Sequence, residues 1–182
     1  MNDGLIPQRY AKALYKFALE NGKSEVVYDE MKNVILSFEA NKEFSKVLAN
    51  PYVCKADKEK LLLAAAGDKR EEAYDNFVKL ILDNKRENFA YQSALAYRKL
   101  YRKDNNISQV EIITAVKLGD GEMGKIRSLV QESCKGKTLE FTYSVNPEII
   151  GGFVVNVDSI KMDASISNEI EQLRLNLLSR NY

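Results

Sequence analysis

Residues 104–118 of the chain read DNNISQVEIITAVKL, and the hydrophobic period changes within this stretch. Before it, apolar residues recur every three or four positions, which is typical of amphipathic helices. Within it, every second residue from position 110 is apolar or threonine, which indicates a strand: Val110, Ile112, Thr114, Val116 and Leu118. The change predicts a domain boundary near Asn105, with domains of residues 1–105 and 106–182.

The first domain is predicted to be helical throughout. Its apolar residues fall into six segments of helical spacing, separated by breakers such as Asn21-Gly22, Asn50-Pro51 and Gly67-Asp68. Pro7 suits the first turn of the first helix. Six short helices with short connections favour a compact bundle.

The second domain is predicted to run strand, helix, strand, hairpin, helix. Residues 139–145 and 153–157 alternate in the manner of strands, and residues 122–134 have helical spacing. The last helix carries an apolar stripe of Ile166, Ile170, Leu173 and Leu177. The predicted fold class is therefore α+β, with an N-terminal six-helix bundle followed by a small α/β C-terminal domain.

Composition excludes several classes of function. The net charge of +1 argues against binding nucleic acid through a basic face. The chain has no histidine, which removes the commonest general base and transition-metal ligand. Cys54 and Cys134 are far apart and are interpreted as reduced thiols of a cytosolic protein, so no metal site is expected. Neither a signal peptide nor a run of ~18 apolar residues is evident, so contact with a membrane is expected only through partners.

The loop GDGEMGKI, residues 119–126, offers a candidate nucleotide site. Gly119, Gly121 and Gly124 satisfy GxGxxG between a predicted strand and a predicted helix, and Glu140 lies about twenty residues on, where a ribose ligand is found in dinucleotide-binding domains. A nucleotide-binding regulatory module that uses Gly119 to Lys125 is therefore the alternative function.

Physical arguments weigh against this alternative. Ile126 stands where a phosphate-binding loop needs a hydroxyl for magnesium, and Asp120 and Glu122 place carboxylates where phosphate oxygens would lie. The other interpretation is a polar turn that starts a helix, with Glu122 favourable in its first turn. No cofactor is expected.

Asp158 and Asp163 are a second candidate, as a catalytic carboxylate pair. Acid–base catalysis needs carboxylates with perturbed pKa values that converge in a cleft. Asp158 instead fits a hairpin turn, and Asp163 or Ser165 fits the start of the last helix. Without a nucleophile–base pair elsewhere, the sequence favours binding over catalysis.

Two helices of the first domain are apolar over more of their circumference than one packed side requires. In the first, Tyr10, Leu14 and Phe17 are at the centre of an arc of roughly 200°, whereas about 100° suffices for one contact. In the second, Phe77 and Ile81 form a stripe that Leu80 widens. Either these helices are buried on several sides, or they frame a groove for a helix of another chain.

Several segments in order resemble one family, the delta subunit of bacterial F-type ATP synthases, whose mitochondrial counterpart is the oligomycin-sensitivity-conferring protein. RYAKALYKFALENGK (residues 9–23) is similar to its first helix, and the Asn50-Pro51 break and FVKLILDNKR (residues 77–86) are similar to later elements. The most specific match is NPEIIGGFVVNVDSIKMDASI, residues 146–166, with the family-signature positions Pro147, Gly151, Gly152, Asp163 and Ser165.

Three residues in turns depart from the usual family pattern. Asn146 replaces an aspartate, and Asp158 and Ala164 stand where glycine is common. They concern local geometry and leave the resemblance of the whole chain intact.

The resemblance implies a function without catalysis. Such subunits bind the N-terminal helix of an alpha subunit and hold the C-terminal ends of the b subunits. They thereby join the catalytic head to the peripheral stalk against rotor torque during proton-driven ATP synthesis. Other head subunits would be contacted indirectly, at the cytoplasmic face of the bacterial cell membrane. The family's groove lies between its first and fifth helices, which implies these lining residues: Tyr10, Leu14, Phe17, Phe77, Leu80 and Ile81. A helical adaptor for an unrelated amphipathic peptide is a further alternative.

Overall fold

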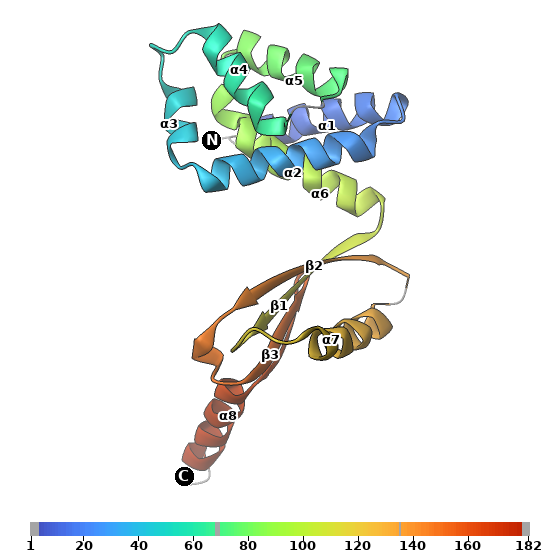
Figure 1. Ribbon diagram of the computed structural model, residues 1–182, viewed down its shortest axis with the longest axis vertical. Helices are drawn as coiled ribbons and strands as arrows, with labels where there is room; N and C mark the ends of the chain where they lie inside the picture. The colour runs from blue at the N-terminus through green and yellow to red at the C-terminus, as the bar shows by residue number, and fades with distance from the viewer. Residues whose placement is uncertain (1–3, 68–69, 135, 180–182) are drawn as a thin grey trace. The chain divides into compact units, whose positions relative to one another are not determined.

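The computed structural model describes residues 4–67, 70–134 and 136–179. Contacts within the chain divide it into two units, Met1–Asp104 and Asn105–Tyr182. In its described residues the first unit is helical, and the second holds a sheet with two helices (Figure 1). The predicted α+β fold class is confirmed.

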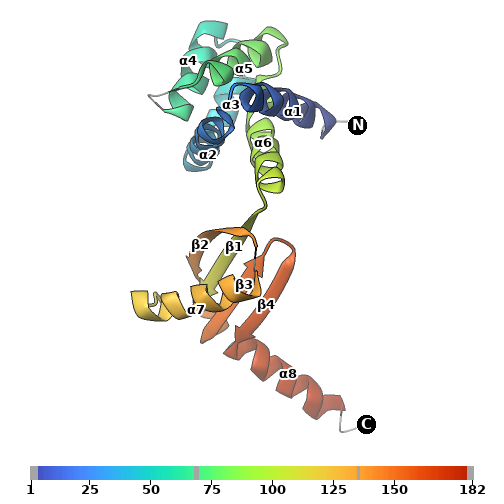
Figure 2. The same cartoon turned by 90° about the vertical axis from the view of Figure 1, so that its right-hand side faces the viewer.

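The first unit contains six α-helices in its described residues. They are α1 (Leu5–Glu20), α2 (Ser24–Ala40), α3 (Glu43–Ala49), α4 (Lys55–Ala66), α5 (Glu72–Asp83) and α6 (Ala90–Asp104), with the 3-10 turn η1 (Glu87–Phe89) before α6. Helix α6 packs against α1 and α2, α4 packs against α2 and α5, and α1 also contacts α5 (Figure 2).

Tyrosines join the helices at the centre of this bundle. Tyr74 and Tyr97 are almost completely buried, and each satisfies its hydroxyl by donating to a backbone carbonyl, that of Leu62 at 2.7 Å and that of Ser24 at 3.0 Å. Tyr15 of α1 meets Tyr97 of α6 edge to face, with ring centroids 5.6 Å apart. A buried tyrosine needs such a partner, because an unpaired hydroxyl in the core costs free energy.

Two ionisable groups are also buried in the bundle. Lys58 donates to Glu87 at 2.6 Å, and the two side chains are 7% and 15% exposed. Glu30 is 3% exposed and accepts a hydrogen bond from the backbone N–H of Glu71 at 2.6 Å, which is the residue before α5. The first contact joins α4 to the turn η1 before α6, and the second joins α2 to the residue before α5.

The second unit is built around a four-stranded sheet in the order β2-β1-β3-β4. The elements are β1 (Ile107–Thr114), α7 (Asp120–Ser133), β2 (Thr138–Val145), η2 (Pro147–Ile149), β3 (Gly152–Val157), β4 (Ile160–Ser165) and α8 (Ile166–Ser179). Strands β1 and β2 are parallel and joined by α7, whereas β3 is antiparallel to both β1 and β4. Side chains of β1, β3 and α7 form its core: Val110, Ile112, Ile126, Val130 and Val155.

Strand β1 is shorter than its alternating pattern predicts. Thr114 pairs with Val145 and Phe153, which lie at the end of β2 and near the start of β3. Beyond this point β2 has ended and β3 contributes only Gly152, so in the described residues neither strand extends the ladder along Val116 and Leu118. The Thr114 hydroxyl instead donates to the carbonyl of Val116 at 2.8 Å.

Helix α8 follows directly on β4 and packs mainly against β4 and η2. None of its described residues is buried (Figure 1). The predicted stripe is present but exposed, with Ile170 52% and Leu173 62% accessible.

Candidate binding groove between α1 and α5

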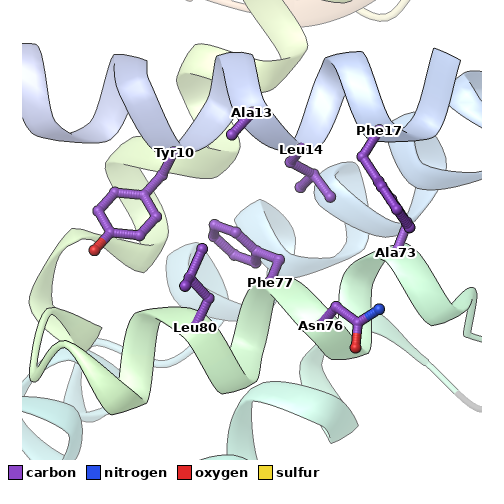
Figure 3. Close-up of a pocket in the computed structure, with 8 residues that line it drawn as sticks. All are labelled: Tyr10, Ala13, Leu14, Phe17, Ala73, Asn76, Phe77 and Leu80. Atoms are coloured by element: carbon purple, nitrogen blue, oxygen red, sulfur yellow. The ribbon is translucent and has the colours of Figure 1, made fainter. Parts of the chain in front are cut away.

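Helix α1 presents two apolar faces to different surroundings. Tyr15 touches Tyr97 and Tyr101 of α6, and Ala11 and Ala18, one turn away on the same side, are completely buried. The other apolar face is turned toward α5 (Figure 3). The over-wide arc of the sequence is therefore the sum of a core face and a groove face.

Helix α5 is divided in the same way. Its core side chains are Tyr74, Val78, Ile81 and Leu82. Its groove face follows the helical spacing i, i+3, i+4, i+7, which comprises Ala73, Asn76, Phe77 and Leu80.

A hollow of about 260 Å³ lies between these two groove faces. Leu14 and Phe77 lie deep in it at 5% and 7% exposure, while Phe17 and Leu80 are 43% and 48% exposed. Figure 3 shows the side chains of α1 and α5 pointing toward each other across the hollow. Its full lining is Tyr10, Ala13, Leu14, Phe17, Ala73, Asn76, Phe77 and Leu80. We call this hollow the apolar section of the groove.

A second hollow of about 390 Å³ shares Tyr10, Ala13 and Leu80 with the first. It runs toward the start of α1 and the end of α5, and its further lining residues are Ile6, Arg9, Asn84 and Arg86. We call it the basic section. The two hollows together form a groove along about three turns of α1, or ~16 Å.

The end of α5 places Arg86 in the basic section. The N–H of Arg86 donates to the Ile81 carbonyl at 2.8 Å, and that of Lys85 donates to the Leu82 carbonyl at 3.0 Å. Lys85 has φ 53, so the helix closes with a left-handed residue in a Schellman motif. The Asn-x-Arg segment is thus the cap that turns the chain at the mouth of the groove.

Five of the six predicted groove residues line the hollow: Tyr10, Leu14, Phe17, Phe77 and Leu80. Ile81 does not, because it is completely buried in the bundle. It lies about 40° beyond Phe77 toward the core at ~100° per residue, so it belongs to the core face. Three lining residues, Ala13, Ala73 and Asn76, were missed by sequence reasoning. The helical spacing of Ala73 and Asn76 from Leu80 was the signal that could have found those two.

The family-signature residues form the connection from β2 to α8. Gly152 has φ 74, and a Cβ there would lie 2.1 Å from the Ala164 carbonyl oxygen. A Cβ on Gly151 would lie 2.6 Å from Cδ1 of Ile166, and the Gly151 carbonyl accepts the first N–H of α8 at 3.1 Å. Pro147 begins the short turn η2. Glycine is required at position 152, because its φ is positive and a backbone oxygen lies too close for a side chain, whereas at Gly151 the close atom is the end of the exposed Ile166 side chain, which has room to move.

Asp163 and Ser165 start α8, as predicted. Asp163 accepts hydrogen bonds from the N–H and hydroxyl of Ser165, at 3.1 and 2.6 Å. The Ser165 hydroxyl in turn accepts from the N–H of Asn168 at 3.2 Å, which caps the helix. Hydrogen bonds from Ser165 and Lys161 lower the pKa of Asp163.

Asp158 has the turn role that its sequence context predicts. It has φ 50 and accepts from the N–H of Gln109 at 3.1 Å. Although burial raises its pKa, hydrogen bonds from Ser108 and Gln109 and the charge of Lys137 lower it overall. A general acid needs a raised pKa, so the lowered pKa values of Asp158 and Asp163 do not favour that role for either aspartate.

The geometry of the Gly119 loop does not favour a nucleotide. Gly121 and Gly124 lie inside α7, and a Cβ at either would meet no atom within 4 Å. The N–H of Gly119 already faces the Glu122 carboxylate at 3.4 Å, which places a negative charge where a phosphate would bind.

Among the residues that the structure describes, no cluster of three or more His, Cys, Asp or Glu could hold a metal. Within the same residues, no helix is long and apolar enough to cross a membrane.

Comparison with known proteins supports both the observed fold and the family resemblance of the sequence. The family model for the ATP synthase delta (OSCP) subunit matches residues 6–177. The chain is 37% identical to ATP synthase subunit delta of Parabacteroides distasonis over 178 residues, covering 98% of each protein. It is 36% identical to that of Phocaeicola vulgatus over 179 residues, covering 98% of this chain and 96% of the relative. A chain in the cryo-EM structure of the Toxoplasma gondii mitochondrial ATP synthase hexamer has the same fold, with a TM-score of 0.72, 20% identity and 98% of both chains covered. The chain therefore belongs to the ATP synthase delta (OSCP) subunit family.

Proposed function

We propose that the chain is the stator connector of a bacterial F-type ATP synthase. The first unit binds the N-terminal helix of an alpha subunit, and the second unit contacts the C-terminal ends of the b subunits in the peripheral stalk. The protein works without a cofactor at the cytoplasmic face of the cell membrane, to which only its partners attach it. Its task is mechanical, because the head must be kept from turning with the rotor during proton-driven synthesis.

The observation that carries the proposal is the apolar groove between α1 and α5. Its deep residues, Leu14 and Phe77, are held by the bundle, while Phe17 and Leu80 are half exposed at its edges. An amphipathic helix that fills such a groove buries its apolar face at i, i+3, i+4 and i+7. The family consists of structural subunits, which accords with a groove for binding rather than a catalytic cleft.

Contact with the stalk is supported by the exposed apolar surface of α8. Six large side chains of this helix are between 44% and 64% accessible: Ile166, Ile170, Leu173, Leu175, Leu177 and Leu178. Four of them, Ile166, Ile170, Leu173 and Leu177, share one side of the helix at helical spacing, and an exposed apolar stripe of this kind is typical of an interaction site. The two proposed partners therefore use separate surfaces on separate units.

Titration of the full chain with a synthetic peptide of the alpha N-terminal helix tests the groove. Phe17→Asp places a charge at the edge of the apolar section, whereas Leu19→Asp places the same charge on the same helix, outside both hollows, at a residue that is 57% exposed. We expect the peptide to bind the parent chain and the Leu19 variant. We expect Phe17→Asp to weaken binding at least ~30-fold, the effect of losing an interface residue worth ~2 kcal/mol.

Circular dichroism separates loss of binding from loss of fold. Both variants should keep the helical signal of the parent, since Phe17 and Leu19 are both exposed. No binding of the peptide to the parent chain at micromolar concentrations would remove the groove assignment. Unfolding of the bundle by Phe17→Asp would show that Phe17 is a core residue.

A further inference from the structure

The groove is electrostatically asymmetric along its length. Its apolar section has no charged lining residue among those described, whereas the basic section contains Arg9 and Arg86. Of the described residues that line either hollow, none is acidic. One end of the binding surface is therefore uncharged and the other carries two cations.

Neither guanidinium group is neutralised by a described residue. The hydrogen bonds and ion pairs within the described ranges do not include the side chain of Arg9 or Arg86. This contrasts with Arg70 in the same unit, whose Nε lies 3.4 Å from an Asp75 carboxylate oxygen. Arginine holds its charge at any physiological pH, and its planar group suits carboxylate recognition.

The start of α1 adds to this positive character. The helix begins without a side-chain hydrogen bond at its cap and without an acidic residue in its first turn. Its backbone N–H groups thus contribute a partial positive charge near Ile6 and Arg9. An incoming anion would meet two guanidinium groups and this helix terminus together.

The lining residues also distinguish the two ends of the groove. Helices α1 and α5 run antiparallel across the groove, so Phe17 lies across from Ala73 and Tyr10 lies by Leu80 (Figure 3). The basic section lies beyond Tyr10, at the start of α1 and the end of α5. A helix laid in the groove in one direction places a given end against the arginines, and the reverse direction moves that end to Phe17.

We propose that the groove binds its helix in a single direction, set by an Asp or Glu side chain at one end of the helix's apolar face that pairs with Arg9 and Arg86. This inference rests on the proposed function and specifies the chemistry of its partner. The occupant is a helix of about three turns with apolar residues at i, i+3, i+4 and i+7 and a carboxylate beyond one end of that stripe. In the opposite direction the carboxylate would lie beside Phe17, at the end of the groove away from Arg9 and Arg86, and would lose the ion pair.

Charge exchange between the two partners tests the proposal. The alpha N-terminal peptide is titrated into the full chain, its Arg86→Glu variant, and a Lys12→Glu variant as the matched control. Lys12 is an exposed cation of α1 outside both hollows, so its reversal alters net charge by the same amount. We expect Arg86→Glu to raise Kd at least ~10-fold and Lys12→Glu to raise it less than ~3-fold. Replacing the acidic residue of the peptide by lysine should restore at least ~3-fold of the affinity for Arg86→Glu.

Direction is read separately with a nitroxide label on either end of the peptide. With the label at the acidic end, the amide resonances of Arg9 and Asn84 should broaden. With the label at the other end, those of Phe17 and Ala73 should broaden. Equal broadening of the two sets by either label means two orientations and overturns the proposal.

The remaining outcomes separate this inference from the proposed function. If the peptide binds but Arg86→Glu and Lys12→Glu change Kd equally, the groove assignment stands and the directional pairing is wrong. Equally tight binding of an alpha peptide without any acidic residue would also show that the pairing is wrong. If the parent chain does not bind the peptide, the groove assignment itself fails, and the inference fails with it.

Discussion

Replacing Glu30 with glutamine should make the helical bundle more stable at neutral and alkaline pH. Glu30 is 3% exposed, and one of its carboxylate oxygens is buried without a hydrogen-bond partner among the described residues. Burial is the main cause that raises its pKa from 4.5 to about 7, with contributions from the negative charges of Glu71 and Asp75. The hydrogen bond from the Glu71 N–H and the charge of Arg70 oppose this rise without cancelling it.

The direction of the pH dependence follows from the two pKa values. The folded chain binds the Glu30 proton more tightly than the unfolded chain, for which the pKa is close to 4.5. The contribution of the proton to stability is therefore complete below about pH 4.5 and is lost as the pH rises to about 7. At about 1.4 kcal/mol for each pH unit between 4.5 and about 7, the ionised carboxylate lowers the free energy of unfolding by about 3 kcal/mol.

Glutamine keeps the oxygen that accepts from Glu71 and removes the charge at every pH. Its amide group would occupy the place of the unpartnered oxygen, as the hydroxyl of the protonated acid does, so the variant resembles protonated Glu30. We expect Glu30→Gln to raise the free energy of unfolding by about 2–3 kcal/mol at pH 8 and by less than about 1 kcal/mol at pH 5.

Urea unfolding followed by circular dichroism at several pH values measures this difference, and carbon NMR of the labelled carboxyl measures the pKa. Glu39→Gln is the control, because Glu39 is an exposed residue of the same helix and glutamine retains its contact with Tyr91. A Glu30 carboxyl that titrates near its ordinary value would refute the reasoning. A variant that is less stable than the parent at pH 8 would do so as well.

Two further substitutions test buried contacts in the two units. Lys58→Ala leaves the Glu87 carboxylate buried without its ion-pair partner and should lower the free energy of unfolding by about 3–5 kcal/mol, as measured by urea titration. The double variant Lys58→Ala/Glu87→Ala should recover part of this loss. Gly152→Ala should destabilise the second unit by more than about 2 kcal/mol because of its positive φ and the close backbone atom, whereas Gly121→Ala, in the open surface of α7, should add about 0.5–1 kcal/mol of stability. Thermal unfolding that ranks the two glycine variants equally would contradict this reasoning.

The sequence predicted most of the elements because helix and strand periods are local signals. The change of period near Asn105 matches the end of α6 at Asp104 and the start of β1 at Ile107. The end of β1 at Thr114 was not predictable in this way, because it depends on where β2 ends and where the antiparallel strand β3 begins. Strand length is set by neighbours distant in sequence, and an alternating pattern does not report them.

Sequence reasoning found part of the lining of the hollow between α1 and α5. A helical wheel identifies side chains that share a face, so Tyr10, Leu14 and Phe17 were found together. It does not say which edge of a broad apolar face meets the core, and this is why Ile81 was misplaced. Arg86 was not identified as a lining residue because its position depends on the left-handed turn at Lys85, a non-glycine residue that carries no sequence signal for that conformation.

Side-chain exposure distinguishes the part of a broad apolar face that the chain covers itself from the part it leaves open. On α1 the face that packs against α6 includes Ala11 and Ala18, both completely buried, because two helices of one chain approach closely at small side chains. The face toward the groove instead presents Phe17, which remains 43% exposed, opposite the exposed Leu80 of α5. Large apolar side chains that no described element covers lose their contact with water only when another chain binds. On α8 the described isoleucines and leucines are all exposed as well, so each unit presents an apolar surface that supports one of the proposed partner contacts.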